Sequence, residues 1–119
     1  MAKFDPPPKF SFRSNEWEEW LQDFQRFRIA SKLHKEEGDV QRDSLLYCMG
    51  SRKAEQVMTS FRWGKTRVPD PNNANQEVEV DEVDTMYDIL VNKFTNYFIP
   101  RRNIIHERSI FKAGLPKQN

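Results

Sequence analysis

The chain has 119 residues, which leaves room for one domain with one hydrophobic core. Aromatic residues make up 13% of the sequence, a content that a disordered tail would lack, and the formal net charge is only +1. This balance excludes a strongly basic nucleic-acid-binding arm and an acidic tail for the chain as a whole. The single Cys excludes an internal disulfide framework and a zinc knuckle within this segment.

The sequence has no apolar run close to the about 20 residues that a membrane-spanning helix requires. Its first residues, MAKFDPPP, also lack the apolar segment of a secretory signal. We therefore expect a cytoplasmic protein that makes no membrane contact.

Residues 1–14 are predicted to form an extended leader, because three consecutive prolines remove backbone donors and favour polyproline II. Two interpretations of this leader stay open. It is either a flexible segment, or it lies across the rest of the domain and fills an aromatic-lined groove, since Phe10 and Phe12 would otherwise be exposed. Such a groove could equally accept a Pro- and aromatic-containing peptide from another protein. The residues expected to dock are Pro7, Pro8, Phe10 and Phe12.

A first helix is predicted from Asn15, a suitable N-cap, to near Leu33. Glu18 stands three residues after Asn15 and completes a capping-box pattern. Apolar side chains then recur at helical spacing and form one stripe, with charged and amide side chains on the other side. The stripe consists of Trp17, Trp20, Leu21, Phe24 and Phe27.

Two shorter helices are predicted next. One runs from about Asp39 to Gly50, with apolar residues on several sides, as is typical of a buried helix. The other is capped by Ser51 and ends by Gly64. Their predicted core residues are Leu45, Leu46, Met58 and Phe61.

Residues 65–80, KTRVPDPNNANQEVEV, are predicted to be a surface loop, because they contain two Pro and three Asn and show no helical periodicity. The EVEV run at 77–80 is compatible with a short strand, but the loop is the preferred interpretation. A loop of this length in a small domain is either mobile or carries contacts.

A fourth helix is predicted from Asp81 to Pro100, where the ring must interrupt it, and a fifth from about Arg102 toward Phe111. Core positions of the fourth helix are Leu90, Phe94 and Phe98. The predicted fold class is therefore all-α: a compact bundle of about five helices over residues 15–115, preceded by an extended Pro-rich N-terminal segment.

The sequence lacks the motifs that usually mark an enzyme. It contains no Gly-rich phosphate loop, no HExxH and no GxSxG. His34 and His106 lie on separate predicted elements, and Cys48 lies in the most apolar helix, where a buried, unreactive thiol is expected. We therefore predict a protein that is not an enzyme, with no catalytic residues, no metal site and no cofactor.

Charge is unevenly distributed along the chain. Residues 77–88 contain six acidic residues and no basic one, whereas residues 101–117 contain five basic residues and one Glu. These are either two solvated faces or complementary patches that meet between neighbouring copies. A third possibility, contact between the basic end and nucleic acid, is weakened by the lack of interleaved aromatics. The interface candidates are Glu82, Asp84, Arg101, Arg102 and Arg108.

Three stretches, taken together, resemble one family. They are PPPKFSFRSNEWEEWLQDFQRF, LLYCMGSRKAEQVMTSF and YDILVNKFTNYFIPRRNIIHERSIF. In this order they are similar to the gag proteins of gypsy-type long-terminal-repeat retrotransposons (Metaviridae). The matching positions are Phe10, Trp17, Trp20 and Phe24; Leu45, Leu46, Gly50, Ala54 and Phe61; and Leu90, Phe94, Tyr97, Phe98, Pro100, Asn103, Glu107, Arg108 and Phe111.

The resemblance implies the N-terminal lobe of a capsid protein. In that family such lobes pack into hexameric and pentameric rings of a virus-like shell that packages RNA. As an isolated lobe, this chain would then associate weakly or be monomeric. Arg101 and Arg102 would be candidates for a contact with another copy or with RNA. The alternative is a domesticated gag lobe, similar to that of the neuronal protein Arc, that acts as an adaptor and binds Pro- and aromatic-containing peptides in a hydrophobic groove.

The chain also departs from the family pattern. After Phe111 the family continues with a Gln-rich stretch, a second helical lobe and often a Cys/His zinc knuckle. The resemblance therefore implies that residues 116–119 are a tail leading to a C-terminal lobe absent from this sequence, and that most RNA contacts lie in such absent parts. The stretch at 65–76 is longer than the link expected in the family.

Overall fold

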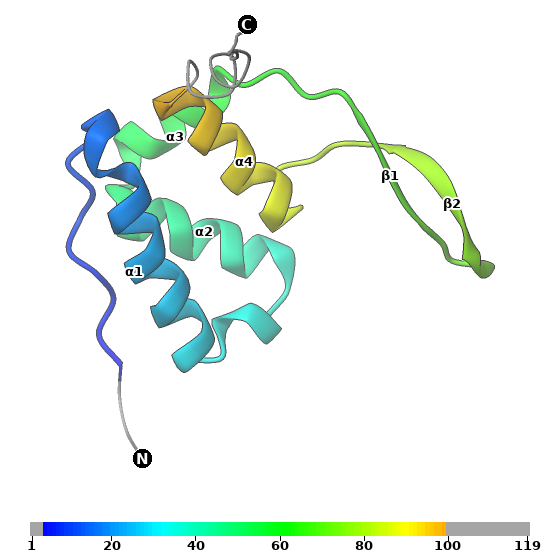
Figure 1. The fold of residues 1–119 in the computed structure, drawn as a ribbon, viewed down its shortest axis with the longest axis horizontal. Coiled ribbons are helices and arrows are strands. Elements are labelled where there is room, and N and C mark those ends of the chain that lie inside the picture. The colour runs from blue at the N-terminus through cyan, green and yellow to red at the C-terminus, as the bar shows by residue number, and fades with distance from the viewer. Residues whose placement is uncertain (1–3, 100–119) are drawn as a thin grey trace, which may run out of the picture.

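The computed structural model describes residues 4–99, and the structural statements below concern this part of the chain. It contains four α-helices, two short 3-10 helices and two β-strands. Figure 1 shows the helices gathered into one body and the strands extending away from it. In chain order the elements are η1 (Ser14–Glu16), α1 (Trp17–Ala30), η2 (Leu33–Lys35), α2 (Gly38–Met49), α3 (Arg52–Thr59), β1 (Lys65–Asp70), β2 (Asn73–Asp81) and α4 (Tyr87–Phe98).

The prediction of an all-α bundle of about five helices is wrong. The segment assigned to a surface loop forms an antiparallel two-stranded sheet from β1 and β2, so the fold combines α-helices with a β-hairpin. The predicted fifth helix, at 102–111, lies outside the described residues.

The hairpin forms because two short alternating segments complement each other. KTRV and EVEV each place a polar or charged residue before every β-branched one, which is the period of a strand. Pairing sets Thr66 opposite Val80 and Val68 opposite Val78, so the β-branched side chains share one face. Each half is only four residues long, so neither alone gave a convincing strand signal.

Of the Pro and Asn residues that suggested a loop, Pro71 and Asn72 form the turn of this hairpin, and the others lie in its strands. The Asp70 carboxylate accepts a hydrogen bond from the Asn72 N–H at 2.8 Å, as in an Asx turn. Pro69 lies in β1, and because the sheet has two strands, both strands are edges, where a missing N–H is tolerated. The register shifts between Pro69 and Asp70, so the pairing is irregular next to the turn.

The helix boundaries differ from the predicted ones at several ends. Helix α1 begins at Trp17, because Ser14–Glu16 forms a 3-10 turn where Asn15 was expected to be the cap. It ends at Ala30, just before Lys32 adopts a left-handed φ of 64°. Helix α4 begins at Tyr87, since the chain near Asp81 is still completing strand β2.

The hydrophobic core lies between α1, α2 and α4 and is largely aromatic. The rings of Trp20 and Phe24 stack at 5.6 Å, and those of Trp17 and Phe94 lie 6.0 Å apart. Three of the predicted core residues, Leu21, Met58 and Phe61, are half-buried and pack against this cluster. The buried apolar residues are Phe10, Trp17, Trp20, Phe24, Leu45, Leu46, Cys48, Met49, Ala54, Tyr87, Leu90, Val91, Phe94 and Phe98.

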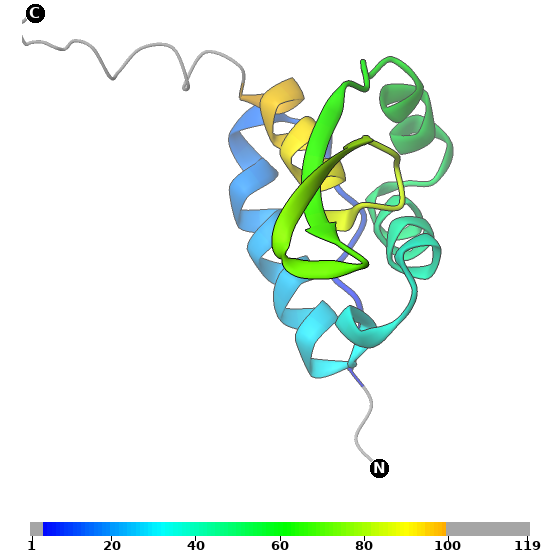
Figure 2. The same cartoon turned by 90° about the vertical axis from the view of Figure 1, so that its right-hand side faces the viewer.

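Figure 2 shows the molecule turned so that the hairpin faces the viewer, with the four helices behind it. The two views agree that the hairpin projects from the helical body on the side opposite α1. None of the described helices is long and apolar enough to cross a membrane.

Candidate functional site

The leader, residues 4–13, runs along the helical body beside α1 and is fixed to it by hydrogen bonds (Figure 1). The indole N–H of Trp20 donates to the carbonyl oxygen of Pro8 at 2.6 Å. The backbone N–H of Phe10 donates to the carbonyl oxygen of Met49, at the end of α2, at 3.2 Å. The leader thereby bridges α1 and α2.

Phe10 fills an aromatic groove. Its side chain is only 5% exposed. Its ring centroid lies 5.3 Å from that of Trp17, 5.7 Å from that of Trp20 and 5.0 Å from that of Phe98. The edge-to-face arrangements with Trp17 and Phe98 are those that aromatic quadrupoles favour. The groove is therefore built by α1 and α4 and is occupied by the chain's own leader.

The other leader residues expected to dock are less enclosed. Phe12 is half-buried, with its ring 6.1 Å from that of Phe98, and its φ of 64° is unusual for a non-glycine residue. The ammonium of Lys53 lies 4.8 Å from the Phe12 ring centroid. Pro7 is half-buried and Pro8 is exposed, so the prolines contribute mainly through backbone shape.

A shallow pocket beside the leader exposes apolar surface of α2. Tyr47 is 66% exposed and Val40 is 40% exposed. The ammonium of Lys9 lies 5.7 Å from the Tyr47 ring centroid. The pocket is lined by Pro6, Phe27, Val40, Asp43, Ser44, Tyr47 and Cys48.

The base of the hairpin is held to the helical body by Glu82. Its carboxylate accepts a hydrogen bond from the Gly64 N–H at 2.9 Å and lies 3.1 Å from the Lys93 ammonium on α4. The Glu82 N–H donates back to the Gly64 carbonyl oxygen at 2.9 Å. The Gly64 N–H first, and then Lys93, lower the pKa of the Glu82 carboxyl, because both interactions favour its ionised form.

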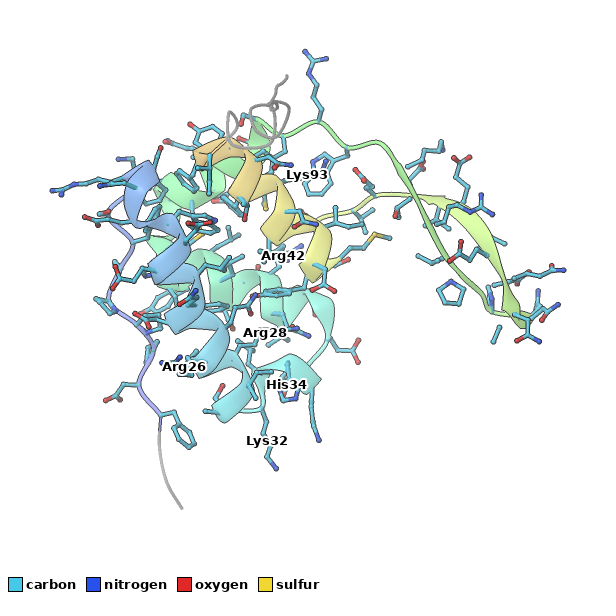
Figure 3. The ribbon with its side chains drawn as sticks, viewed as in Figure 1. Arg26, Arg28, Lys32, His34, Arg42 and Lys93 are labelled. Carbon is cyan, nitrogen blue, oxygen red and sulfur yellow. The ribbon has the colours of Figure 1, made fainter. Side chains whose placement is uncertain are left out.

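Lys93 joins this anchor to the end of α3. Its ammonium donates to the carbonyl oxygen of Arg62 at 2.8 Å and lies 5.0 Å from the ring centroid of Trp63. Figure 3 labels Lys93 where α4 meets the start of the hairpin. We call Glu82, Gly64 and Lys93 the hairpin anchor; it fixes the direction in which the hairpin leaves the body.

Both acidic interface candidates are therefore engaged within the chain. Asp84 accepts a hydrogen bond from Arg42 of α2 at 2.9 Å, and Arg42 also pairs with Asp43. The hydrogen bonds that Arg42 donates to Asp43 and to Asp84 raise the pKa of Arg42. The basic interface candidates Arg101, Arg102 and Arg108 lie outside the described residues, so the expected meeting of the two patches stays a hypothesis.

A groove on α1 is mostly apolar and lies at the C-terminal half of that helix. Ile29, one of the residues that line it, is 54% exposed. Residues 24–35 contain four Lys and Arg and no Asp or Glu. Arg26, Lys32 and Lys35 form no ion pair with any residue between 4 and 99. We call this surface the α1 groove; it is lined by Leu21, Gln22, Gln25, Arg26, Ile29 and Ala30.

A buried polar network fixes the connection between α1 and α2. Gln41, 7% exposed, donates to the carbonyl oxygens of His34 and Glu36 at 3.3 and 2.8 Å and accepts from Arg28 at 2.8 Å. The Arg28 guanidinium stacks 4.0 Å from the ring centroid of Tyr87, and burial raises the pKa of the Tyr87 hydroxyl. Figure 3 shows Arg28 and His34 near this connection. The network gives the end of α1 a fixed shape.

The titratable residues considered for chemistry occupy structural positions. Burial raises the pKa of the Cys48 thiol, which disfavours the reactive thiolate. His34 Nδ1 lies 3.4 Å from the carbonyl oxygen of Arg28, and His106 lies outside the described residues. Within residues 4–99 no three His, Cys, Asp or Glu side chains are grouped so that they could hold a metal ion.

Sequence reasoning missed the hairpin anchor and the Gln41 network. The sequence pattern assigned Glu82 to a run of acids and to the interface candidates, without Lys93 and Gly64 as its partners. No local pattern marks these contacts, since Gly64 and Glu82 are 18 residues apart and Arg28 and Gln41 are 13 apart. Gln41 lies among Asp39, Arg42, Asp43 and Ser44 in α2, so its sequence context did not mark it as a buried polar group.

Comparisons of this chain with protein-family models, with curated proteins and with solved structures found no match.

Proposed function

We propose that the chain is a structural self-assembly module of the retrotransposon gag capsid type, whose copies pack side by side in the rings of a shell that encloses RNA. The resemblance of its three motifs, in the family's order, supports the family assignment. One structural observation carries the self-assembly part: the β1–β2 hairpin projects from the body with a fixed base and an uncovered apolar face.

A two-stranded hairpin without cover is at best marginally stable in water. Val68, Val78 and Val80 are not among the apolar residues that pack against the core. Beyond the base of the hairpin, strands β1 and β2 mainly contact each other. An apolar strand face held out in a fixed direction is more stable when another molecule covers it, and in a self-assembly module that molecule is a second copy.

The filled groove favours this function over a peptide-binding adaptor. Phe10 occupies the space between Trp17, Trp20 and Phe98. The transfer of its side chain from water to the interior stabilises the fold by about 1.5–3 kcal/mol. A partner peptide would first have to displace the leader and offset this term. The groove therefore serves the stability of the domain before any ligand binding.

Sedimentation velocity over a range of protein and salt concentrations, with negative-stain electron microscopy of the same samples with and without RNA, tests the proposal. We expect association that grows with concentration and yields rings or shells. Because an isolated lobe of this kind is expected to associate weakly, the range extends to millimolar concentration and low salt, and a chain that is still monomeric there would contradict the proposal.

The adaptor is a second candidate, favoured by the way the leader is held. A proline carbonyl bound by an indole N–H, next to a phenylalanine in an aromatic pocket, is a pattern that a Pro- and aromatic-containing peptide could reproduce. Fluorescently labelled leader peptide, residues 4–12, can be titrated into the whole chain and into a variant with Phe10→Ala. An adaptor would bind the peptide saturably in the whole chain, whereas a purely structural groove would bind it in the variant alone.

A further inference from the structure

We propose that the β-branched face of the β1–β2 hairpin of one copy docks on the α1 groove of the next copy, in a head-to-tail contact. This inference rests on the proposed self-assembly function and names the two surfaces that meet. Three properties of these surfaces favour the contact: their apolar character, their opposite charge and their positions on the molecule.

The first property is apolar complementarity. The hairpin presents Thr66, Val68, Val78 and Val80 on one face, each half-buried by its neighbours alone, while the charged side chains lie on the other face. The α1 groove is lined by the exposed Ile29 among others, and its lining surface is almost wholly apolar. Contact between the two surfaces would remove apolar area of both from water.

The second property is charge. Residues 65–81 carry four carboxylates and two cations, whereas residues 24–35 carry four cations and no carboxylate. Within the hairpin, Lys65 pairs with Asp81 and Arg67 with Glu77, and Glu79 has no ion-pair partner among residues 4–99. The excess charge of the hairpin is thus negative; it is carried by the strand face opposite the β-branched one, so it attracts Arg26 of the α1 groove at longer range and not by direct pairing.

The same charges disfavour contact between two hairpins. Strand β2 carries Glu77, Glu79 and Asp81, so pairing of two β2 edges would set carboxylates against carboxylates. Strand β1 has Pro69 on its length and Lys65 and Arg67, features that block edge pairing. The second copy therefore contributes a helical surface in preference to its own hairpin.

The third property is position. The hairpin leaves the body on the side opposite α1, and Arg26 lies on α1, away from the hairpin (Figure 3). One chain presents the two surfaces in opposite directions, so the contact is heterologous and generates a ring or an open chain of copies. A contact of four strand residues is small compared with a stable interface, so closure of a ring would supply the remaining affinity.

The test is sedimentation velocity of the chain and four single variants, up to millimolar concentration and at low salt. Val78→Glu alters the hairpin face and Ile29→Glu alters the α1 groove. Asn75→Glu, beside the hairpin turn, and Val40→Glu, exposed on α2, add the same charge elsewhere and are the matched controls. Circular dichroism melting checks that each variant is folded. Ile29→Glu is decisive if Val78→Glu loosens the hairpin, because Ile29 does not touch the hairpin.

We expect Val78→Glu and Ile29→Glu each to weaken association at least tenfold, the controls to change it less than twofold, and salt to weaken it. Mixing the two defective variants should give a one-to-one complex that grows no further, because each retains the surface that the other has lost.

Association of Ile29→Glu that equals that of the unmodified chain would overturn the contact and leave the proposed function standing. A defect in Val78→Glu alone, without recovery on mixing, would point to paired hairpins and also overturn it. An unmodified chain that stays monomeric would overturn the proposed function itself.

Discussion

Two buried indoles show how individual residues combine burial with a satisfied donor. Trp17 is fully buried and its N–H donates to the Thr95 hydroxyl at 2.9 Å, while Trp20, 7% exposed, donates to the carbonyl oxygen of Pro8. A buried N–H without a partner would cost about 1–3 kcal/mol, so each hydrogen bond removes a penalty that would otherwise offset the gain from burial. The two donors link α1 to α4 and to the leader.

Trp20→Ala is expected to lower the free energy of unfolding by about 3–5 kcal/mol, because it removes the stack on Phe24 and leaves a cavity. Trp20→Phe retains most of the ring and is expected to cost about 1–2 kcal/mol, chiefly through the hydrogen bond to the leader. Urea denaturation measures both. Equal losses in the two variants would show that the hydrogen bond, not the packing, dominates.

Gly38 begins α2 where the backbone of a neighbouring segment passes closely. A Cβ at this position would lie 2.2 Å from the carbonyl oxygen of Thr85, which cannot move away without moving the chain before α4. We expect Gly38→Ala to destabilise the fold by more than about 2 kcal/mol, a size typical of overpacking against backbone. Gly64→Ala is the control, since its nearest atom would be 3.9 Å away. A melting temperature unchanged in both variants would contradict the close approach.

At the scale of elements, the hairpin and the leader are the two segments whose placement depends on contacts far along the chain. Helical periodicity and capping residues predicted about five helices, of which four are present within residues 4–99, and the apolar stripe on α1. A loop was predicted where the hairpin forms, because KTRV and EVEV are each too short to indicate a strand unless they are seen to pair with each other. Whether the leader docks could not be predicted, because the burial of Phe10 depends on Phe98, a residue on the last described helix.

Loss of the leader contact is expected to destabilise the domain. Phe10→Ala removes a ring that is in contact with α1 and α4, and we expect a loss of about 3–5 kcal/mol in the free energy of unfolding. Phe4→Ala, at an exposed position of the same leader, should change stability by less than about 0.5 kcal/mol. Guanidinium denaturation of both variants provides the comparison. A Phe10→Ala variant as stable as the unmodified chain would show that the leader is not docked in solution.

The hairpin anchor is expected to depend on pH. The folded protein lowers the pKa of Glu82, so its ionised form stabilises the fold above the unfolded pKa, about 4.3, and this contribution is lost as pH falls through the folded value. The amide proton shift of Gly64 in NMR spectra should report the titration, with a midpoint below about 4.3. In Glu82→Gln this titration should be absent. A midpoint at or above the ordinary glutamate value would contradict the anchor geometry.

At the scale of the whole molecule, the described chain has a helical body with an aromatic core and an arm that contributes nothing to that core. Periodicity predicted most of the core of the body, because those residues obey the helical repeat, whereas Phe10 of the leader does not. The candidate interaction surfaces could not be predicted in the same way. The α1 groove depends on which part of α1 the leader, α2 and α4 leave uncovered, and the acids expected at an interface, Glu82 and Asp84, are neutralised by basic residues elsewhere in the chain.

Hydrogen exchange should reflect this division. Amides of the hairpin are expected to exchange fastest among the described strands and helices, since β1 and β2 are covered only by each other. Amides of α1 and α4, which enclose Trp17 and Phe94, are expected to exchange slowest, with a protection that matches the global free energy of unfolding. Hairpin amides as protected as those of α4 in the monomer would contradict an uncovered arm.

The contact between Phe10 and Phe98 also has a consequence for the chain during its synthesis. The leader and α1 are synthesised before Phe98, which completes the leader's groove, and before Thr95, which accepts the hydrogen bond of the Trp17 indole. The aromatic residues of α1 therefore lack part of their core contacts until α4 has been translated. In a nascent chain stalled after α3, these residues would be accessible to chaperones. Synthesis of α4 would then allow them to become buried.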